Sequence, residues 1–158
     1  MIIKLEEYYF NQGVYGRVFY KKDNSQKRAV KVFFKSTDKS NEHINNTFKS
    51  EVDAYNIICK NQELQNYIPK FYGQISIDKI IDKNGIEISD KYYLEYAYEM
   101  EFIEGTFRKY GNNYTTCNIL KAFIEEGVAN MKDCSAIIKD GKPIKIIDFS
   151  TEEFELSH

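Results

Sequence analysis

Three charged residues stand where their side chains need chemical partners. Asp148 follows the apolar run of the segment IKIIDFS, and a carboxylate at the end of a buried strand suits a metal ion. Lys31 lies inside the β-branched and aromatic segment RAVKVFF, where a buried ammonium group requires an anionic partner. Glu51 lies on one side of a helical pattern, FKSEVDAYNII, and is the candidate partner. The alternatives are a solvated turn for Asp148 and a purely structural ion pair for Lys31.

The elements that must position these residues follow from local patterns. Alternating apolar residues predict strands, apolar residues three and four apart predict helices, and Asn-Gly or Asp-Gly pairs predict tight hairpin turns. Gly127 is expected to end the second helix. The expected strands are residues 2–10, 16–22, 28–34, 71–81 and 91–102, the helices are 43–60 and 115–127, and a hairpin over 136–148 turns at Asp140-Gly141.

The order of these features resembles the protein kinase fold and its kinase-like relatives. A glycine turn within NQGVYGRVFYKK, a strand lysine, a helix glutamate and a terminal Asp-Phe follow one another. IPKFYG, YEMEFIEG and SAIIKDGKPIKIIDFS extend the resemblance over nearly the whole chain. It implies an α+β fold with a five-stranded antiparallel N-lobe sheet and one long helix, followed by a minimal C-lobe of a helix and a β-hairpin. Residues 1–158 would form one such domain, with an N-lobe over 1–103 and a reduced C-lobe over 104–158.

The resemblance assigns an ATP-binding role to the first half of the chain. Gly13, Gly16 and Val18 match the loop that covers the phosphates, where glycines let backbone amides approach the oxygens. Asn11 replaces the first glycine of that pattern. Lys31 would contact the α- and β-phosphates while Glu51 holds it.

The resemblance also implies which residues would contact the adenine ring and which would bind the metal ion. Met100 would face the adenine ring, and the backbone of Glu101 and Ile103 would supply the hinge hydrogen bonds. Asp148 would bind magnesium, and Ser135 stands where the family has a second magnesium ligand, an asparagine.

The catalytic loop departs from the family pattern in both possible registers. Counting back from Lys139 places Asn130 on the catalytic aspartate. Counting forward from Gly127 instead places Asn130 on the family's histidine and Lys132 on the aspartate. Asp133 lies one helical turn from Asn130 and is the one carboxylate that a rearranged loop could present, the alternative being an exposed turn residue.

Composition excludes several classes of function. The 158 residues carry a net charge of −2 with acids and bases interspersed, which argues against nucleic-acid or membrane binding. The three cysteines have no C-x-x-C pairing and only two histidines accompany them, so a zinc site is not expected. The absence of a long apolar run predicts a soluble, intracellular and cytoplasmic protein. The chain ends ten residues after Asp148, so the large lobe is minimal or the chain is a fragment.

Three functions follow as hypotheses. The first is a pseudokinase-like regulator that binds ATP with magnesium, has impaired or lost phosphotransfer to protein substrates, and acts through a protein partner. The second is an active minimal serine/threonine-type protein kinase that uses Asp133. The third is an interaction module that binds no nucleotide.

Overall fold

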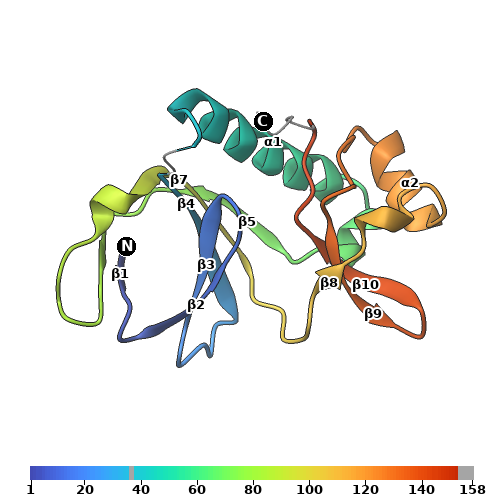
Figure 1. The fold of residues 1–158 in the computed structure, drawn as a ribbon. Helices are drawn as coiled ribbons and strands as arrows, with labels where there is room; N and C mark the ends of the chain where they lie inside the picture. The colour runs from blue at the N-terminus through green and yellow to red at the C-terminus, as the bar shows by residue number, and fades with distance from the viewer. Residues whose placement is uncertain (36–37, 153–158) are drawn as a thin grey trace. The chain divides into compact units, whose positions relative to one another are not determined.

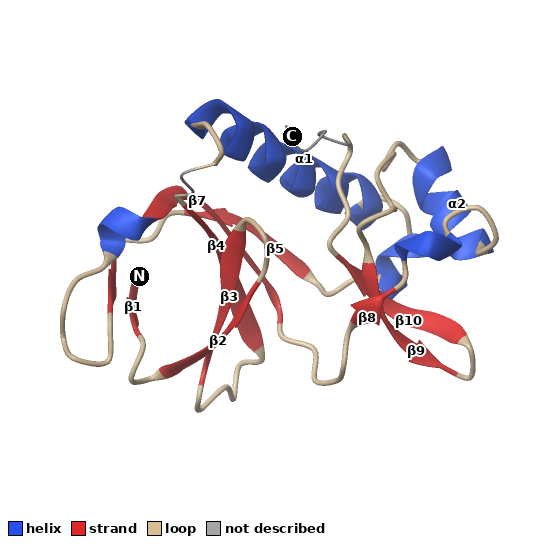
Figure 2. Cartoon of the chain, in the orientation of Figure 1, coloured by secondary structure: helices blue, strands red, loops and turns tan. Residues whose placement is uncertain are grey.

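The computed structural model describes residues 1–35 and 38–152 and has an α+β architecture (Figures 1 and 2). The predicted five-stranded antiparallel sheet and long helix are both present. Among the described residues, no helix combines the length and the apolar character needed to cross a bilayer.

Contacts divide the chain into two compact units. Unit 1 comprises Met1–Phe48 and Tyr72–Phe102, and unit 2 comprises Lys49–Phe71 and Ile103–His158. The boundary falls inside helix α1 (Asn41–Cys59), so each unit contains part of this helix. The sequence pattern assigns residues 49–71 to the N-terminal part of the chain, whereas their contacts are made in unit 2.

The five-stranded sheet has the order β2-β3-β4-β7-β5 (Figure 1). The β2–β3, β3–β4 and β4–β7 ladders are antiparallel. The central strand β4 buries residues on both faces, which explains its nearly continuous apolar sequence. The strands are β2 (Tyr8–Gln12), β3 (Gly16–Lys21), β4 (Arg28–Phe34), β5 (Phe71–Ile75) and β7 (Tyr92–Glu101).

Two of the predicted strands are each broken in two. The first is divided into β1 (Ile2–Lys4) and β2, and the fourth is divided into β5 and β6 (Lys79–Ile81). β1 and β6 pair in parallel as a separate two-stranded sheet. The predictions of continuous strands over 2–10 and 71–81 are therefore wrong, because alternation of side chains reveals extended backbone but not a change of pairing partner.

Opposite faces of the sheet in unit 1 bury different residues. One face belongs to an apolar cluster that includes Phe19, Val30 and Val32, together with Ile3 and Ile80 from the β1–β6 pair. The other face packs against the first half of α1, whose Phe48 ring contacts the rings of Phe33, Tyr96 and Tyr98 at centroid distances of 5.6, 5.5 and 6.5 Å. Both faces of β4 are therefore covered.

Unit 2 contains a three-stranded sheet of order β10-β9-β8 and the helix α2 (Asn118–Glu125). Its strands are β8 (Arg108–Lys109), β9 (Ser135–Lys139) and β10 (Lys142–Ile147). The predicted hairpin turn is confirmed, since Asp140 and Gly141 have φ values of 53° and 75°, as a type I′ turn requires. Gly127 has a φ of 112°, as expected of the residue that ends a helix.

Candidate functional site

The glycine turn connects β2 to β3. The Gly13 amide donates a hydrogen bond to the Gly16 carbonyl at 2.8 Å, and Val14 at the tip is 73% exposed. A Cβ on Gly16 would lie 2.5 Å from the carbonyl oxygen of Val32, whereas a Cβ on Gly13 would meet nothing closer than 3.6 Å. Packing against β4 therefore requires glycine at position 16, and Gly13 is the glycine that packing does not explain.

Lys31 lies directly between Val18 on β3 and Tyr98 on β7 in the register of the sheet. The expectation of a buried lysine holds only in part, because this side chain is half-buried and its Nζ atom lies 4.9 Å from the ring centroid of Phe33. Interaction with an aromatic face stabilises an ammonium group without complete desolvation. Glu51 is 7% exposed and belongs to unit 2, so its pairing with Lys31 stays a prediction.

The predicted hinge residues lie at the end of β7. Met100 is 7% exposed and pairs with Ala29 across the sheet, and Glu101 pairs with Arg28. The chain then leaves unit 1, since Ile103 is the first residue of the next segment of unit 2. The residues predicted to form the hinge therefore lie at the point in the sequence where unit 1 ends and unit 2 resumes.

Unit 2 brings Asn130, Asp133 and Ser150 together. The Asn130 Nδ2 atom donates hydrogen bonds to Asp133 Oδ2 and to Ser150 Oγ, both at 3.1 Å. The backbones of Asn130 and Ser150 also exchange two hydrogen bonds, at 3.0 and 3.2 Å. Asn130 is 7% exposed, and its Oδ1 atom is buried without a partner among the described residues. One acceptor is therefore available at the centre of this cluster, beside an exposed carboxylate.

Asp148 follows β10 and is exposed, with a φ of 62°. Left-handed backbone at a non-glycine residue requires support from its surroundings and is often found at functional sites. The next residue supplies that support, because Phe149 is 1% exposed between the rings of Tyr55 and Phe123 at 4.7 and 5.6 Å. The anchored phenylalanine fixes the backbone from which Asp148 projects.

Ser135 is the first residue of β9 and is 7% exposed. It pairs with Ile147 on β10, so the register places it beside the residue that precedes Asp148. Its neighbour Cys134 is unsuited to nucleophilic chemistry, because burial, reinforced by the Asp148 carboxylate, raises the pKa of the Cys134 thiol to about 12.

Sequence reasoning missed two parts of this site. The first is Ser150, whose hydroxyl accepts a hydrogen bond from Asn130 and donates one to the Glu152 carbonyl at 2.8 Å. The second is Tyr55, whose pKa is raised well above 10.0 by burial and then by the charges of Asp148 and Glu51. The four-residue spacing of Glu51 and Tyr55 on one helix was the available signal.

Asn130→Asp is expected to destabilise the protein rather than restore a kinase-like carboxylate. It would place two carboxylates about 3 Å apart, which we expect to lower the free energy of unfolding by roughly 1–3 kcal/mol near neutral pH. Repulsion raises the pKa of the new carboxyl, so the loss should grow as pH rises above about 4 and vanish at lower pH.

Urea denaturation at several pH values measures this effect, and the double variant Asn130→Asp/Asp133→Asn is the matched control. That variant restores a donor and an acceptor with the direction of the hydrogen bond reversed. We expect it to recover part of the lost stability. Equal stability of Asn130→Asp and the parent at neutral pH would contradict the described contact.

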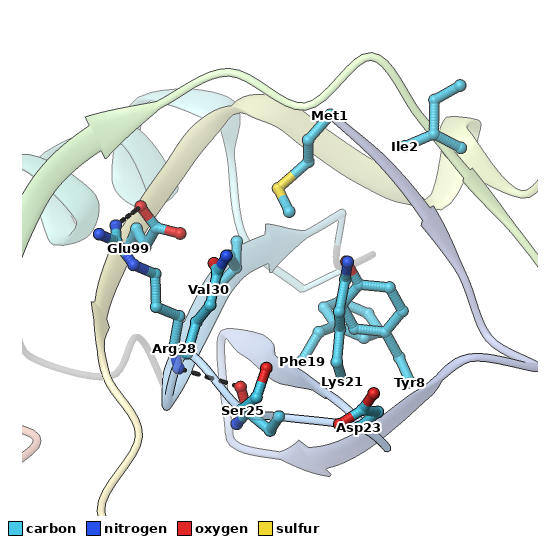
Figure 3. Close-up of a pocket in the computed structure, with 12 residues that line it drawn as sticks. Met1, Ile2, Tyr8, Phe19, Lys21, Asp23, Ser25, Arg28, Val30 and Glu99 are labelled. Atoms are coloured by element: carbon cyan, nitrogen blue, oxygen red, sulfur yellow. Dashed lines mark hydrogen bonds and ion pairs between the residues drawn. The ribbon is translucent and has the colours of Figure 1, made fainter.

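A pocket of about 390 Å³ lies elsewhere in unit 1 and includes none of the predicted site residues (Figure 3). Arg28 and Glu99 form an ion pair of 2.8 Å on one side of it, and Lys21 lies with the rings of Tyr8 and Phe19 on another (Figure 3). The chemistry predicted from the sequence therefore has no counterpart in this cavity.

Within residues 1–35 and 38–152, no group of three or more His, Cys, Asp or Glu side chains is arranged to hold a metal ion. Magnesium in nucleotide sites commonly uses one or two carboxylates together with phosphate oxygens and water. The assignment of Asp148 as the carboxylate of such a site stays a prediction. Comparisons with family models, with curated proteins and with solved structures find no match to this chain.

Proposed function

We propose that this chain is a protein kinase-like protein that binds ATP with magnesium, has impaired phosphotransfer and acts through a protein partner. The observation that carries the proposal is the cluster in unit 2. It joins the segment expected to be the catalytic loop to the residues directly after the predicted metal ligand, through Asn130 and Ser150. Segments twenty residues apart thus meet, which supports the proposal.

The geometry around Asp148 supports a metal-nucleotide role. Its carboxylate is exposed and its backbone is held in a left-handed conformation by the buried Phe149. Asp148 would hold magnesium, with Ser135 nearby in the register of the β9–β10 hairpin. When bound, the metal would neutralise charge on the phosphates. In unit 1, Lys31 and the backbone at Gly13 would bind the phosphate oxygens.

The chemistry of Asn130 supports impaired phosphotransfer. Its Oδ1 atom is buried, so it could accept a hydrogen bond from a substrate hydroxyl, and so orient it, only after the loop moves. A neutral amide is a poor base, so it would not take the proton as a carboxylate does. Positioning would survive while proton acceptance is lost, which predicts binding with weak or no turnover.

A second candidate function is an active minimal kinase, and one contact favours it. Asp133 Oδ2 lies 3.1 Å from Asn130 Nδ2, so an exposed carboxylate is held beside the residue that would orient the hydroxyl. Asp133 would then accept the proton in place of residue 130. In this case Asp133→Asn should abolish phosphotransfer while leaving nucleotide binding intact.

The proposal is tested by thermal unfolding with and without ATP and magnesium. A ligand present at 100 times its dissociation constant stabilises the folded state by about 2.7 kcal/mol, so a rise in Tm of several degrees is expected. Asp148→Asn should remove this shift, because it removes the charge while asparagine tolerates the left-handed backbone. Lys31→Ala should reduce the shift by weakening contact with phosphate.

Asp140→Asn is the matched control for Asp148→Asn. Asp140 is also exposed and left-handed, with a φ of 53°, but lies in the hairpin turn. Its variant should keep the full shift. Absence of any shift in the parent protein at millimolar nucleotide would contradict the proposal and favour an interaction module that binds no nucleotide.

A further inference from the structure

The strand β2 forms an open edge of the five-stranded sheet. Hydrogen bonds from Lys22 N to Glu7 O and from Gly13 N to Gly16 O fix which β2 residues bond to β3. Hydrogen-bonded and non-hydrogen-bonded pairs alternate in an antiparallel ladder, so Tyr9 and Asn11 also bond to β3. The amides and carbonyls of Tyr8, Phe10 and Gln12 therefore point outward from the sheet.

This edge lacks the features that usually block added strands. Proteins protect edges with charged side chains, proline, bulges or a covering segment. The sequence of β2, YYFNQ, has no charge and no proline, and its pairing with β3 is without a bulge. Four of its five residues are exposed, including Tyr9 at 53% and Phe10 at 40%. β2 itself is uncharged and aromatic, whereas the guanidinium of Arg17 on β3 lies 4.5 Å from the Phe10 ring centroid. An edge of this kind is suited to pairing with a strand that carries negative charge.

A small pocket of about 200 Å³ lies beside this edge. Three consecutive residues of the edge strand β2 line it, together with Tyr20, the cross-strand partner of Tyr9 on β3. None of its lining residues carries a carboxylate, and the Lys22 Nζ atom lies 5.4 Å from the ring centroid of Tyr9. The lining residues are Tyr8, Tyr9, Phe10, Tyr20, Lys22 and Lys83.

We infer that the β2 edge binds an extended acidic segment of a partner protein as an added strand. The outward backbone groups of Phe10 and its neighbours supply the ladder, and main-chain bonds of this kind give affinity without regard to sequence. The two ammonium groups in the pocket select a carboxylate side chain at one position of the incoming strand. This inference is independent of nucleotide binding, because it uses none of the residues assigned to that site.

The first test uses synthetic peptides as probes. An acetylated and amidated hexapeptide of alternating Glu and Val carries its carboxylates on one face of a strand, and the same design with Lys in place of Glu is the control. Fluorescence anisotropy of labelled peptides should show saturable binding of the acidic peptide that weakens with salt, and at least about tenfold weaker binding of the basic one. Equal binding of the two peptides would overturn the inference.

Two substitutions at one position test the backbone ladder. Phe10→Pro removes an outward amide that β3 does not use, and Phe10→Ala removes the same aromatic ring but keeps the amide. We expect Phe10→Pro to bind the acidic peptide at least about tenfold more weakly than Phe10→Ala, with both variants folded by circular dichroism. Equal affinities of the two variants would exclude pairing at this edge.

The charge requirement is tested by the double variant Lys22→Gln/Lys83→Gln. It should reduce affinity for the acidic peptide by about tenfold or more, whereas Lys139→Gln/Lys142→Gln in the β9–β10 hairpin of unit 2 should not. Sedimentation equilibrium tests whether a second copy of this chain, rather than an acidic partner, occupies the β2 edge. A dimer that Phe10→Pro dissociates would show that a second copy of this chain fills the edge, which would overturn the assignment to an acidic partner.

Discussion

Phe149→Ala is expected to lower the free energy of unfolding by about 3–5 kcal/mol. The ring is 1% exposed and lies 4.7 Å from Tyr55 and 5.6 Å from Phe123, so truncation leaves a cavity between α1 and α2 within unit 2. Aromatic pairs at such distances contribute beyond the area that they bury. Urea denaturation followed by circular dichroism measures the change.

The same substitution should also disturb the site, because Phe149 directly follows Asp148. The β10 ladder and the Asn130–Ser150 backbone bonds would still flank Asp148, but loss of the buried ring should loosen its backbone at a φ of 62°. Magnesium-ATP should therefore bind more weakly even at temperatures where the variant is folded. Phe149→Leu, which keeps most of the buried volume, should cost less than about 1.5 kcal/mol. Ile144→Ala, at a residue that is 40% exposed, is the control and should change stability by about 0.5 kcal/mol at most. Equal effects of Phe149→Ala and Ile144→Ala would contradict the described packing.

Gly16→Ala is expected to destabilise the protein strongly, whereas Gly13→Ala is expected to change its stability little, although both glycines lie in one turn. A methyl group at position 16 would lie 2.5 Å from the Val32 carbonyl and 3.1 Å from the Phe33 Cα atom. Both obstacles are backbone atoms of a central strand, so the substitution should destabilise the protein by roughly 3 kcal/mol. A methyl group on Gly13 would meet only the Gly16 carbonyl oxygen, at an ordinary contact distance of 3.6 Å, so Gly13→Ala should leave stability within about 1 kcal/mol of the parent.

The nucleotide proposal adds a second expectation for this pair. Gly13→Ala should weaken magnesium-ATP binding without unfolding the protein, since a methyl group there would obstruct approach of the phosphates to the backbone. Thermal unfolding with and without nucleotide separates the two effects. If Gly13→Ala binds nucleotide as the parent does, the turn is an ordinary hairpin connection and does not contact phosphate. If Gly16→Ala is as stable as the parent, the close approach of β3 and β4 is not as described.

Elements governed by local backbone chemistry could be predicted from the sequence. The Asp140-Gly141 turn, the end of α2 before Gly127 and the extents of β4 and β7 all lie close to where the patterns place them. Left-handed backbone favours glycine and aspartate, and β-branched residues favour strands, whatever the rest of the chain does.

Properties that depend on distant segments could not be predicted. The pattern of residues 2–10 indicates extended backbone, yet only tertiary structure divides it between two sheets and pairs β1 with β6. Lys31 was expected to be buried, but aromatic neighbours leave it half-buried. The sequence indicates glycine at position 16 for a turn or for phosphate binding, whereas the approach of Val32 is what requires it.

The candidate site also has features that could be predicted from the sequence and features that could not. The sequence by itself determined which residues are candidates for its chemistry, because residue type and chain order single out Asp148, Asp133 and Lys31. Only the tertiary structure decided that Asn130 would be buried with its amide on Asp133 and Ser150, and that Phe149 would anchor Asp148. The physical reason is that ionisation and hydrogen-bonding capacity belong to individual side chains. Burial and the choice of partner depend on segments that meet only after the chain has folded.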